Sequence, residues 1–276
     1  MQNTFQEHEE NNRYITCNFN YGACGPYQKA LKDKEIKPKY DLAIKYYEEG
    51  VEKNRKAPLR KSIRLLEQIL PQYQGKPQGE RLAYMYADGY YRLKDYFDAG
   101  YQFERFLKTY PQSDKAEEVA FKGAKSYYNV SPRYTLDQTE TDKALVKLQE
   151  YIAKYPGGEH ISEANQLVHD LRDKLEKKEF KVAELYYHQD DYKSAIASMD
   201  NFINENPGSP YREKAYYYRM DAQYVLAVKS VREVMKGRLE KTQKFSEDYI
   251  KYFPEGEYVK KAKDINEDSQ KRLEDF

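Results

Sequence analysis

The sequence has no tryptophan, only two cysteines and four histidines, and no long apolar run. Cys17 and Cys24 are separated by six residues with no histidine close by, so their spacing fits no zinc site. Two cysteines are also too few for a disulfide scaffold. No segment approaches the roughly 20 apolar residues that span a membrane. The formal net charge of +1 indicates neither a nucleic acid nor an acidic membrane surface as a partner.

Tyrosine is what the chain has in abundance. Thirty of its 276 residues are tyrosine, and aromatic residues make up 15% of a chain that is 34% charged. A disordered chain would be poor in aromatic residues, so the composition predicts a folded protein. Because tyrosine packs through its ring while its hydroxyl stays in water, this composition favours thin helical layers over one thick core.

Prolines mark helix ends at regular intervals from about residue 36 onward. Segments such as "FERFLKTYPQS" and "LQEYIAKYPGG" share one template, which recurs roughly every 40 to 50 residues at Pro111, Pro156, Pro207 and Pro254. One template at that interval predicts stacked helical hairpins, since a single hairpin cannot bury both of its faces.

Residues 81–111 show how one unit is built, and their spacing resembles the tetratricopeptide repeat (TPR). Small residues at Ala87 and Ala99 let two helices approach, and aromatic residues such as Phe103 fill the groove beside them. The pattern recurs at Ala124, Tyr127, Ala144 and Leu148, at Ala183, Tyr186, Ala195 and Met199, and more loosely at Ala43, Tyr46, Ser62 and Leu66. The last hairpin lacks the small residues, as expected of a terminal cap.

These patterns predict an all-α fold, a right-handed superhelical array of about five TPR-like helical hairpins. Residues 161–187 read as one helix, longer than a repeat needs, so a long connecting helix is predicted between the third and fourth hairpins. The predicted division has a leader at 1–23, which is disordered or a misassigned start, and a tether at 24–36. An N-terminal half with three repeats follows at 37–163, and a C-terminal half with two repeats and a cap helix at 164–276.

The residue types that carry catalysis do not form a recognisable site. The four histidines are scattered along the chain and none has metal-ligand spacing to another histidine or a cysteine: His8, His160, His169 and His188. The glycines near Gly75 follow no strand, so they do not form a phosphate loop. Carboxylates lie three or four residues from lysines, the usual pattern of a solvated helix. We therefore expect no enzyme activity, no cofactor and no metal.

Tyrosine doublets recur on the first helices of the units. Consecutive helical residues point about 100° apart, so the first tyrosine is expected to pack and the second to lean towards the inner wall of the array. One interpretation is that both only pack. The other is a groove of aromatic faces for an extended peptide, with charged groups that fix its backbone or terminal carboxylate. The candidate groove residues are Tyr40, Tyr47, Arg81, Tyr84, Asp88, Tyr91, Arg92 and Tyr128. The lack of tryptophan argues against a carbohydrate platform.

The flanks of the array resemble a known family more closely than the repeats alone do. "CGPYQKALKDKEIKPKYDLAIKYYEEG" and the second repeat through "TYPQS" resemble the BamD family, the TPR lipoproteins of the bacterial outer-membrane β-barrel assembly machinery, in its Bacteroidetes form. The resemblance covers roughly residues 24–265. It implies a non-enzymatic scaffold that is anchored by a lipid on Cys24 to the periplasmic face of the outer membrane.

The resemblance also implies partners. The amino-terminal repeats would receive unfolded outer-membrane proteins, and the carboxy-terminal repeats would hold the periplasmic domains of the barrel-forming assembly subunit beside other subunits of the complex. No nucleic acid is implied, and the membrane is reached only through the lipid. The alternatives are a general periplasmic TPR adaptor of the Tol-Pal coordinator type and a TPR-based glycan-binding lipoprotein.

Residues 1–23 depart from the family pattern. A lipoprotein signal needs a basic start and an apolar stretch, whereas this segment has Glu7, Glu9 and Glu10. Gly22 and Ala23 are small, as cleavage before a lipidated cysteine requires. We expect that the natural start differs; a soluble protein is the alternative if residues 1–23 are the true start.

Overall fold

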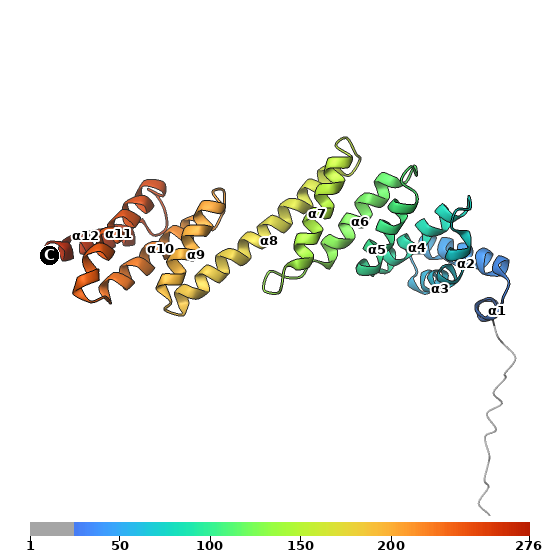
Figure 1. The fold of residues 1–276 in the computed structure, drawn as a ribbon, viewed down its shortest axis with the longest axis horizontal. Coiled ribbons are helices and arrows are strands. Elements are labelled where there is room, and N and C mark those ends of the chain that lie inside the picture. Colours follow the sequence, from blue (N-terminus) through green and yellow to red (C-terminus); the bar gives the residue numbers. More distant parts are fainter. Residues whose placement is uncertain (1–24) are drawn as a thin grey trace, which may run out of the picture. The chain divides into compact units, whose positions relative to one another are not determined.

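The computed structural model describes residues 25–276, and every regular element within that range is an α-helix (Figure 1). The helices are α1 Pro26–Lys32, α2 Ile36–Glu52, α3 Lys56–Tyr73, α4 Gly79–Leu93, α5 Tyr96–Thr109, α6 Ala116–Val130, α7 Thr139–Lys154, α8 Ile161–His188, α9 Tyr192–Glu205, α10 Arg212–Val228, α11 Arg232–Tyr252 and α12 Val259–Leu273. The predicted all-α fold is confirmed for these residues.

The described residues form two compact units, the first ending at Leu93 and the second spanning Lys94–Phe276. The predicted boundary between the two halves of the repeat array, at residues 163 and 164, lies inside the second unit near the start of α8. That division of the repeats stays a prediction. The predicted tether contains a helix: α1 begins at Pro26, where the missing N–H of proline costs nothing. Its Ala30 is buried in the core of the first unit, so most of this segment belongs to the fold.

The first unit is built on the hairpin of α2 and α3, with α4 packed on α3. The predicted small-residue contact is confirmed, because Ala43 and Ser62 are buried and the Ser62 hydroxyl donates to the Ala43 carbonyl oxygen at 2.7 Å. Apolar side chains three or four residues apart on α3, such as Ile63, Leu66 and Ile69, form the core stripe.

The second unit repeats the hairpin through α6–α7, α8–α9 and α10–α11. Residues predicted to pack at the small positions, Ala124, Ala144, Ala183 and Ala195, are all buried. The second helices α5, α7, α9 and α11 each end two residues before the recurring proline, as the template predicts.

Helix α8 confirms the predicted long connecting helix, and Figure 1 shows it running from α7 to α9. Leu167 and Leu171 in its first half are buried with α6 and α7. Phe180 and Ala183 in its second half are buried in a separate core with α9 and α10. One helix therefore supplies side chains to two successive cores.

The expectation that the last hairpin lacks small packing residues is wrong. Ala222 of α10 and Thr242 and Ser246 of α11 are all fully buried. The Thr242 hydroxyl donates to the Arg238 carbonyl at 2.8 Å and the Ser246 hydroxyl to the Thr242 carbonyl at 3.0 Å. Because each hydroxyl is satisfied within its own helix, these residues can take the place of alanine.

One glutamate closes the loop after α7. Glu117 Oε1 of α6 accepts from the Glu159 backbone N–H at 2.7 Å and from the Tyr151 hydroxyl at 3.2 Å. A Cβ at Gly158 would stand 2.3 Å from that oxygen, so a larger residue here would displace the Glu117 carboxylate from these hydrogen bonds. Glu213 makes the corresponding bonds in the loop after α11, to Glu257 at 2.6 Å and Tyr249 at 2.7 Å.

Candidate protein-interaction site

Seven of the eight predicted groove residues lie on two helices of the first unit. Both helices pack on α3: α2 carries Tyr40 and Tyr47, and α4 carries Arg81, Tyr84, Asp88, Tyr91 and Arg92. The eighth, Tyr128, lies on α6 of the second unit. The structure joins Tyr47, Asp88 and Arg92 directly across these two helices, and the candidates of α2 and α4 are described next as the candidate site.

Asp88 is the centre of the candidate site. It is fully buried, and its Oδ2 accepts a 2.6 Å hydrogen bond from the Tyr47 hydroxyl across the two helices. Arg92, one turn later on α4, donates from Nε to the same oxygen. A buried carboxylate is costly unless it is paired and hydrogen-bonded, and these two donors meet that requirement.

The pKa values of the two donors reflect this arrangement. Burial and the neighbouring Asp88 carboxylate raise the pKa of Tyr47 well above its ordinary value of 10. Burial lowers the pKa of Arg92, but its hydrogen bond to Asp88 and the attraction of that carboxylate outweigh this effect and raise it. Tyr47 is therefore a neutral hydrogen-bond donor at physiological pH, and Arg92 is a fixed cation.

Two further contacts flank this centre. Arg81 of α4 forms a 3.1 Å ion pair with Glu48 of α2, and both side chains are more than half exposed. Such a surface pair contributes little to stability, so Arg81 can exchange its partner for another carboxylate at small cost. The ring of Tyr40 stacks on that of Tyr73 from α3, with centroids 5.4 Å apart.

Tyr84 and Tyr91 are both half-buried on α4. Tyr84 lies near enough to Tyr47 to add to the rise of its pKa, after burial and Asp88. The two side chains lie seven residues apart, which places them on the same face of the helix. They stay predicted peptide-contacting residues.

Tyr128 makes in the second unit the kind of bond that Tyr47 makes in the first. Its hydroxyl donates to Asp170 Oδ2 of α8 at 3.3 Å. Burial, followed by the charge of Asp170, raises the pKa of Tyr128. The hydroxyl groups of Tyr47 and Tyr128 thus both have partners within the chain, and the binding role of the two tyrosines stays a prediction.

The tyrosine–aspartate bond recurs along the chain, and of its acceptors sequence reasoning named only Asp88 as a site residue. Tyr187 donates to Asp221, and Tyr224 donates to Asp268 at 2.7 Å. In both cases a cation also pairs with the carboxylate: Lys261 with Asp221 at 3.1 Å and Arg272 with Asp268 at 2.5 Å. The signal in the sequence is an aspartate 34 to 44 residues after the tyrosine.

Metal sites, membrane-spanning helices and the lipidation site are considered next for the part of the chain that the structure describes. Residues 25–276 hold no group of three or more histidine, cysteine, aspartate or glutamate side chains that could bind a metal. None of the described helices has both the length and the apolar character needed to cross a membrane. The predicted lipidation site, Cys24, lies outside the described residues.

Hairpins with buried small residues and a recurring inter-helix bond place the chain in the class of TPR-like helical-repeat proteins. More particularly, the chain belongs to the outer membrane lipoprotein family YfiO, whose model matches residues 41–188 and 185–274.

Two relatives and one solved structure are similar to the chain. It is 29% identical over 268 residues to an Aquifex aeolicus (strain VF5) protein provisionally named outer membrane protein assembly factor BamD, covering 91% of this chain and 85% of the relative. It is 20% identical over 176 residues to the outer membrane protein assembly factor BamD of Caulobacter vibrioides (strain ATCC 19089 / CIP 103742 / CB 15), covering 64% and 58%. A kinesin light chain structure from Podosopora anserina with TPR-like repeats is 13% identical and covers 79% of this chain and 96% of that one. Its TM-score of 0.31 is too low to support a conclusion.

Proposed function

We propose that this chain is a non-enzymatic scaffold of outer-membrane β-barrel protein assembly. The observation that carries the proposal is the family match, which extends over residues 41–274 and includes both units. The relative from Aquifex aeolicus supports it, because the similarity covers 91% of the chain and not a single repeat. A scaffold needs binding surfaces and no reacting groups, in keeping with the paired, neutral tyrosines of the candidate site.

The first unit is proposed to receive unfolded outer-membrane proteins. Its candidate site offers the half-buried rings of Tyr84 and Tyr91 beside the exchangeable ion pair of Arg81. Aromatic faces bind apolar side chains of an extended peptide, and an exposed guanidinium pairs with a carboxylate through two parallel hydrogen bonds. The carboxy-terminal repeats are proposed to hold the periplasmic domains of the barrel-forming assembly subunit.

The anchor is proposed to be a lipid on Cys24, which would hold the protein at the periplasmic face of the outer membrane. The small residues Gly22 and Ala23 precede this cysteine, and helix α1 begins two residues after it, at Pro26. A short tether would keep the repeats close to the membrane surface.

Isolation of the native complex tests the proposal in one experiment. The tagged protein is extracted from cell envelopes in mild detergent, and its partners and its own amino-terminal peptide are identified by mass spectrometry. We expect a barrel-forming subunit in stoichiometric amount and an acylated Cys24. Recovery with Tol-Pal components, or without any barrel-forming subunit, would contradict the assembly role. An unmodified Cys24 thiol would contradict the anchor.

A further inference from the structure

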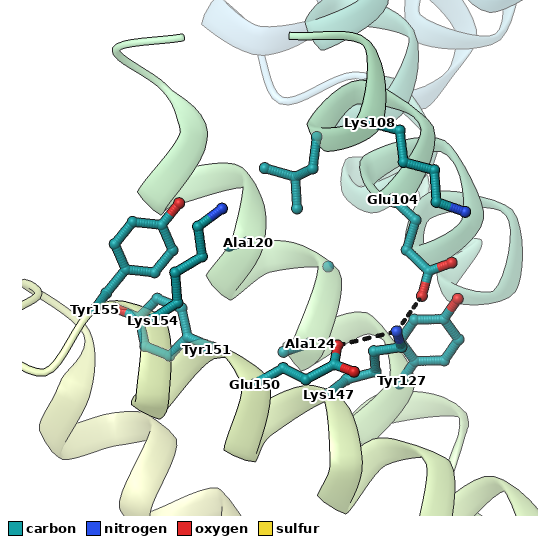
Figure 2. Close-up of a pocket in the computed structure, with 12 residues that line it drawn as sticks. Glu104, Lys108, Ala120, Ala124, Tyr127, Lys147, Glu150, Tyr151, Lys154 and Tyr155 are labelled. Carbon is teal, nitrogen blue, oxygen red and sulfur yellow. Dashed lines mark hydrogen bonds and ion pairs between the residues drawn. The ribbon is translucent and has the colours of Figure 1, made fainter. Parts of the chain in front are cut away.

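The second unit contains a pocket of about 290 Å³ between α5, α6 and α7, drawn in Figure 2. Its floor consists of small residues of α6: Ala120, Gly123 and Ala124. A Cβ at Gly123 would lie 3.2 Å from the Phe103 Cβ of α5, so glycine keeps the two helices close. Leu107 and Tyr155 add apolar walls, and the result is an apolar depression at the surface of the unit.

One end of the pocket is closed by paired charges. Lys147 Nζ of α7 lies 3.0 Å from Glu104 Oε1 of α5 and 3.0 Å from Glu150 Oε2, as the dashed lines in Figure 2 show. Burial lowers the pKa of Lys147, but the hydrogen bonds that it donates to both glutamates outweigh burial and raise it. The positive charge of Lys147 is therefore already compensated by the two glutamates, and this lysine is not available to a ligand.

Two other lysines on the rim lack such partners. Lys108 of α5 and Lys154 of α7 are exposed, and within residues 25–276 neither pairs with a carboxylate. Figure 2 shows them on facing walls of the pocket. The ammonium group of Lys154 lies 5.3 Å from the centre of the Tyr155 ring, a contact that leaves it open to an anion. An apolar depression thus lies beside two exposed lysines, and the three lysines and two glutamates of its lining together carry a net charge of +1.

Exposed aromatic rings continue the surface along α5. Phe97 is 63% exposed and Tyr101 is 53% exposed, although large apolar side chains usually avoid water. They precede Glu104 and Lys108 by steps of three and four residues, so all four lie on one face of the helix. Exposed apolar patches of this kind mark interaction surfaces.

We propose that this α5–α7 surface binds a partner segment that carries two apolar side chains followed by acidic residues. One apolar side chain would enter the pocket, the other would cover Tyr101, and the carboxylates would pair with Lys108 and Lys154. The rise of 1.5 Å per helical residue puts Tyr101 and Leu107 about 9 Å apart, which roughly three residues of extended chain span. This surface lies on a different side of α6 from Tyr128, because the neighbouring Tyr127 lines the pocket.

A capped synthetic peptide tests the proposal on the full chain. The peptide is Ac-Gly-Phe-Ser-Gly-Leu-Ser-Glu-Glu-Gly-amide with a fluorescent label, and binding is followed by fluorescence anisotropy. We expect saturable binding that weakens at least fivefold in the double variant Lys108→Glu with Lys154→Glu, since two attractive contacts become repulsive. The matched control is Lys260→Glu with Lys263→Glu, which makes the same charge change on exposed positions of α12 and should bind normally.

Two further binding measurements test the apolar pocket and the charged rim separately. Ala120→Leu fills the pocket and should weaken binding by a similar factor without a change of rim charge. A peptide with lysine in place of both glutamates should bind poorly to the wild-type protein and better to the charge-reversed variant. The proposal is overturned if the acidic peptide does not bind the wild type, or if the charge-reversed and control variants bind it equally well. If Ala120→Leu fails to fold, the lysine variants alone decide the outcome.

Discussion

Removing the Tyr47 hydroxyl and the Asp88 carboxylate, singly and together, measures how strongly α2 and α4 are joined. Tyr47→Phe deletes one hydrogen bond to a buried charge, a loss of about 1.5–3 kcal/mol. Asp88→Ala removes the acceptor of both Tyr47 and Arg92. The side chain of Arg92 is 39% exposed and can turn to water, so we expect a total of about 2–4 kcal/mol.

The double variant should cost less than the sum of the single variants, because the 2.6 Å bond can be lost only once. We expect a coupling free energy of about 1–2 kcal/mol. The assay is hydrogen exchange read by mass spectrometry on peptides from α2 and α4. Peptides from α8 in the second unit serve as the internal control. Unchanged protection of α2 and α4, or a coupling below about 0.5 kcal/mol, would refute the assignment of this bond as a link between the helices.

The same pair predicts a dependence on alkaline pH. Because the pKa of Tyr47 is raised in the folded state, the folded chain retains its proton after the unfolded chain has lost it near pH 10. The contribution of protonated Tyr47 to the free energy of unfolding is complete below pH 10 and is lost as the pH rises above 10. Tyr47→Phe should remove this part of the alkaline destabilisation, which thermal melts between pH 8 and 11 would reveal. Equal pH slopes for wild type and variant would contradict the assignment.

Two other predictions concern a loop and the candidate site. Gly158→Ala should lower the free energy of unfolding by about 1–3 kcal/mol in denaturant titrations. The neighbouring Gly157→Ala should be nearly neutral, because a Cβ there would have no atom within 4 Å. Equal effects of the two substitutions would mean that the contact with Glu117 is unimportant. Replacing Tyr84 and Tyr91 by Ala should weaken binding of a barrel protein's C-terminal peptide and leave the helical melting curve nearly intact, with Tyr252→Ala on an exposed position as control. Unchanged affinity would rule out the groove, and unfolding would identify the two tyrosines as core residues.

The repeat architecture could be read from the sequence because its signals are local. Helix ends follow from the prolines, and the small positions at Ala124 and Ala183 follow from spacing within one hairpin. The long helix α8 was predictable for the same reason, since no breaker interrupts residues 161–187.

The contacts that position the candidate site were not predictable in the same way. The acceptor for Tyr47 lies 41 residues away, and nothing local distinguishes Asp88 from a solvated carboxylate. Thr242 and Ser246 were overlooked because their hydroxyls are polar until the structure pairs them with carbonyls of α11. Hydrogen bonds satisfy these buried polar groups, between two helices for Asp88 and within α11 for Thr242 and Ser246.

The shared helix α8 has a thermodynamic consequence. In most repeat arrays each unit contributes its own folding energy plus an interface term with its neighbour, so partial unfolding can stop between units. Here the side chains of Leu171 and Phe180 belong to one continuous helix but to successive cores. Unfolding of α8 would remove buried side chains from both cores at once. A partly unfolded state in which only one of the two cores is lost is therefore disfavoured. The second unit is thereby a block in which binding energy gained at one core also stabilises the next.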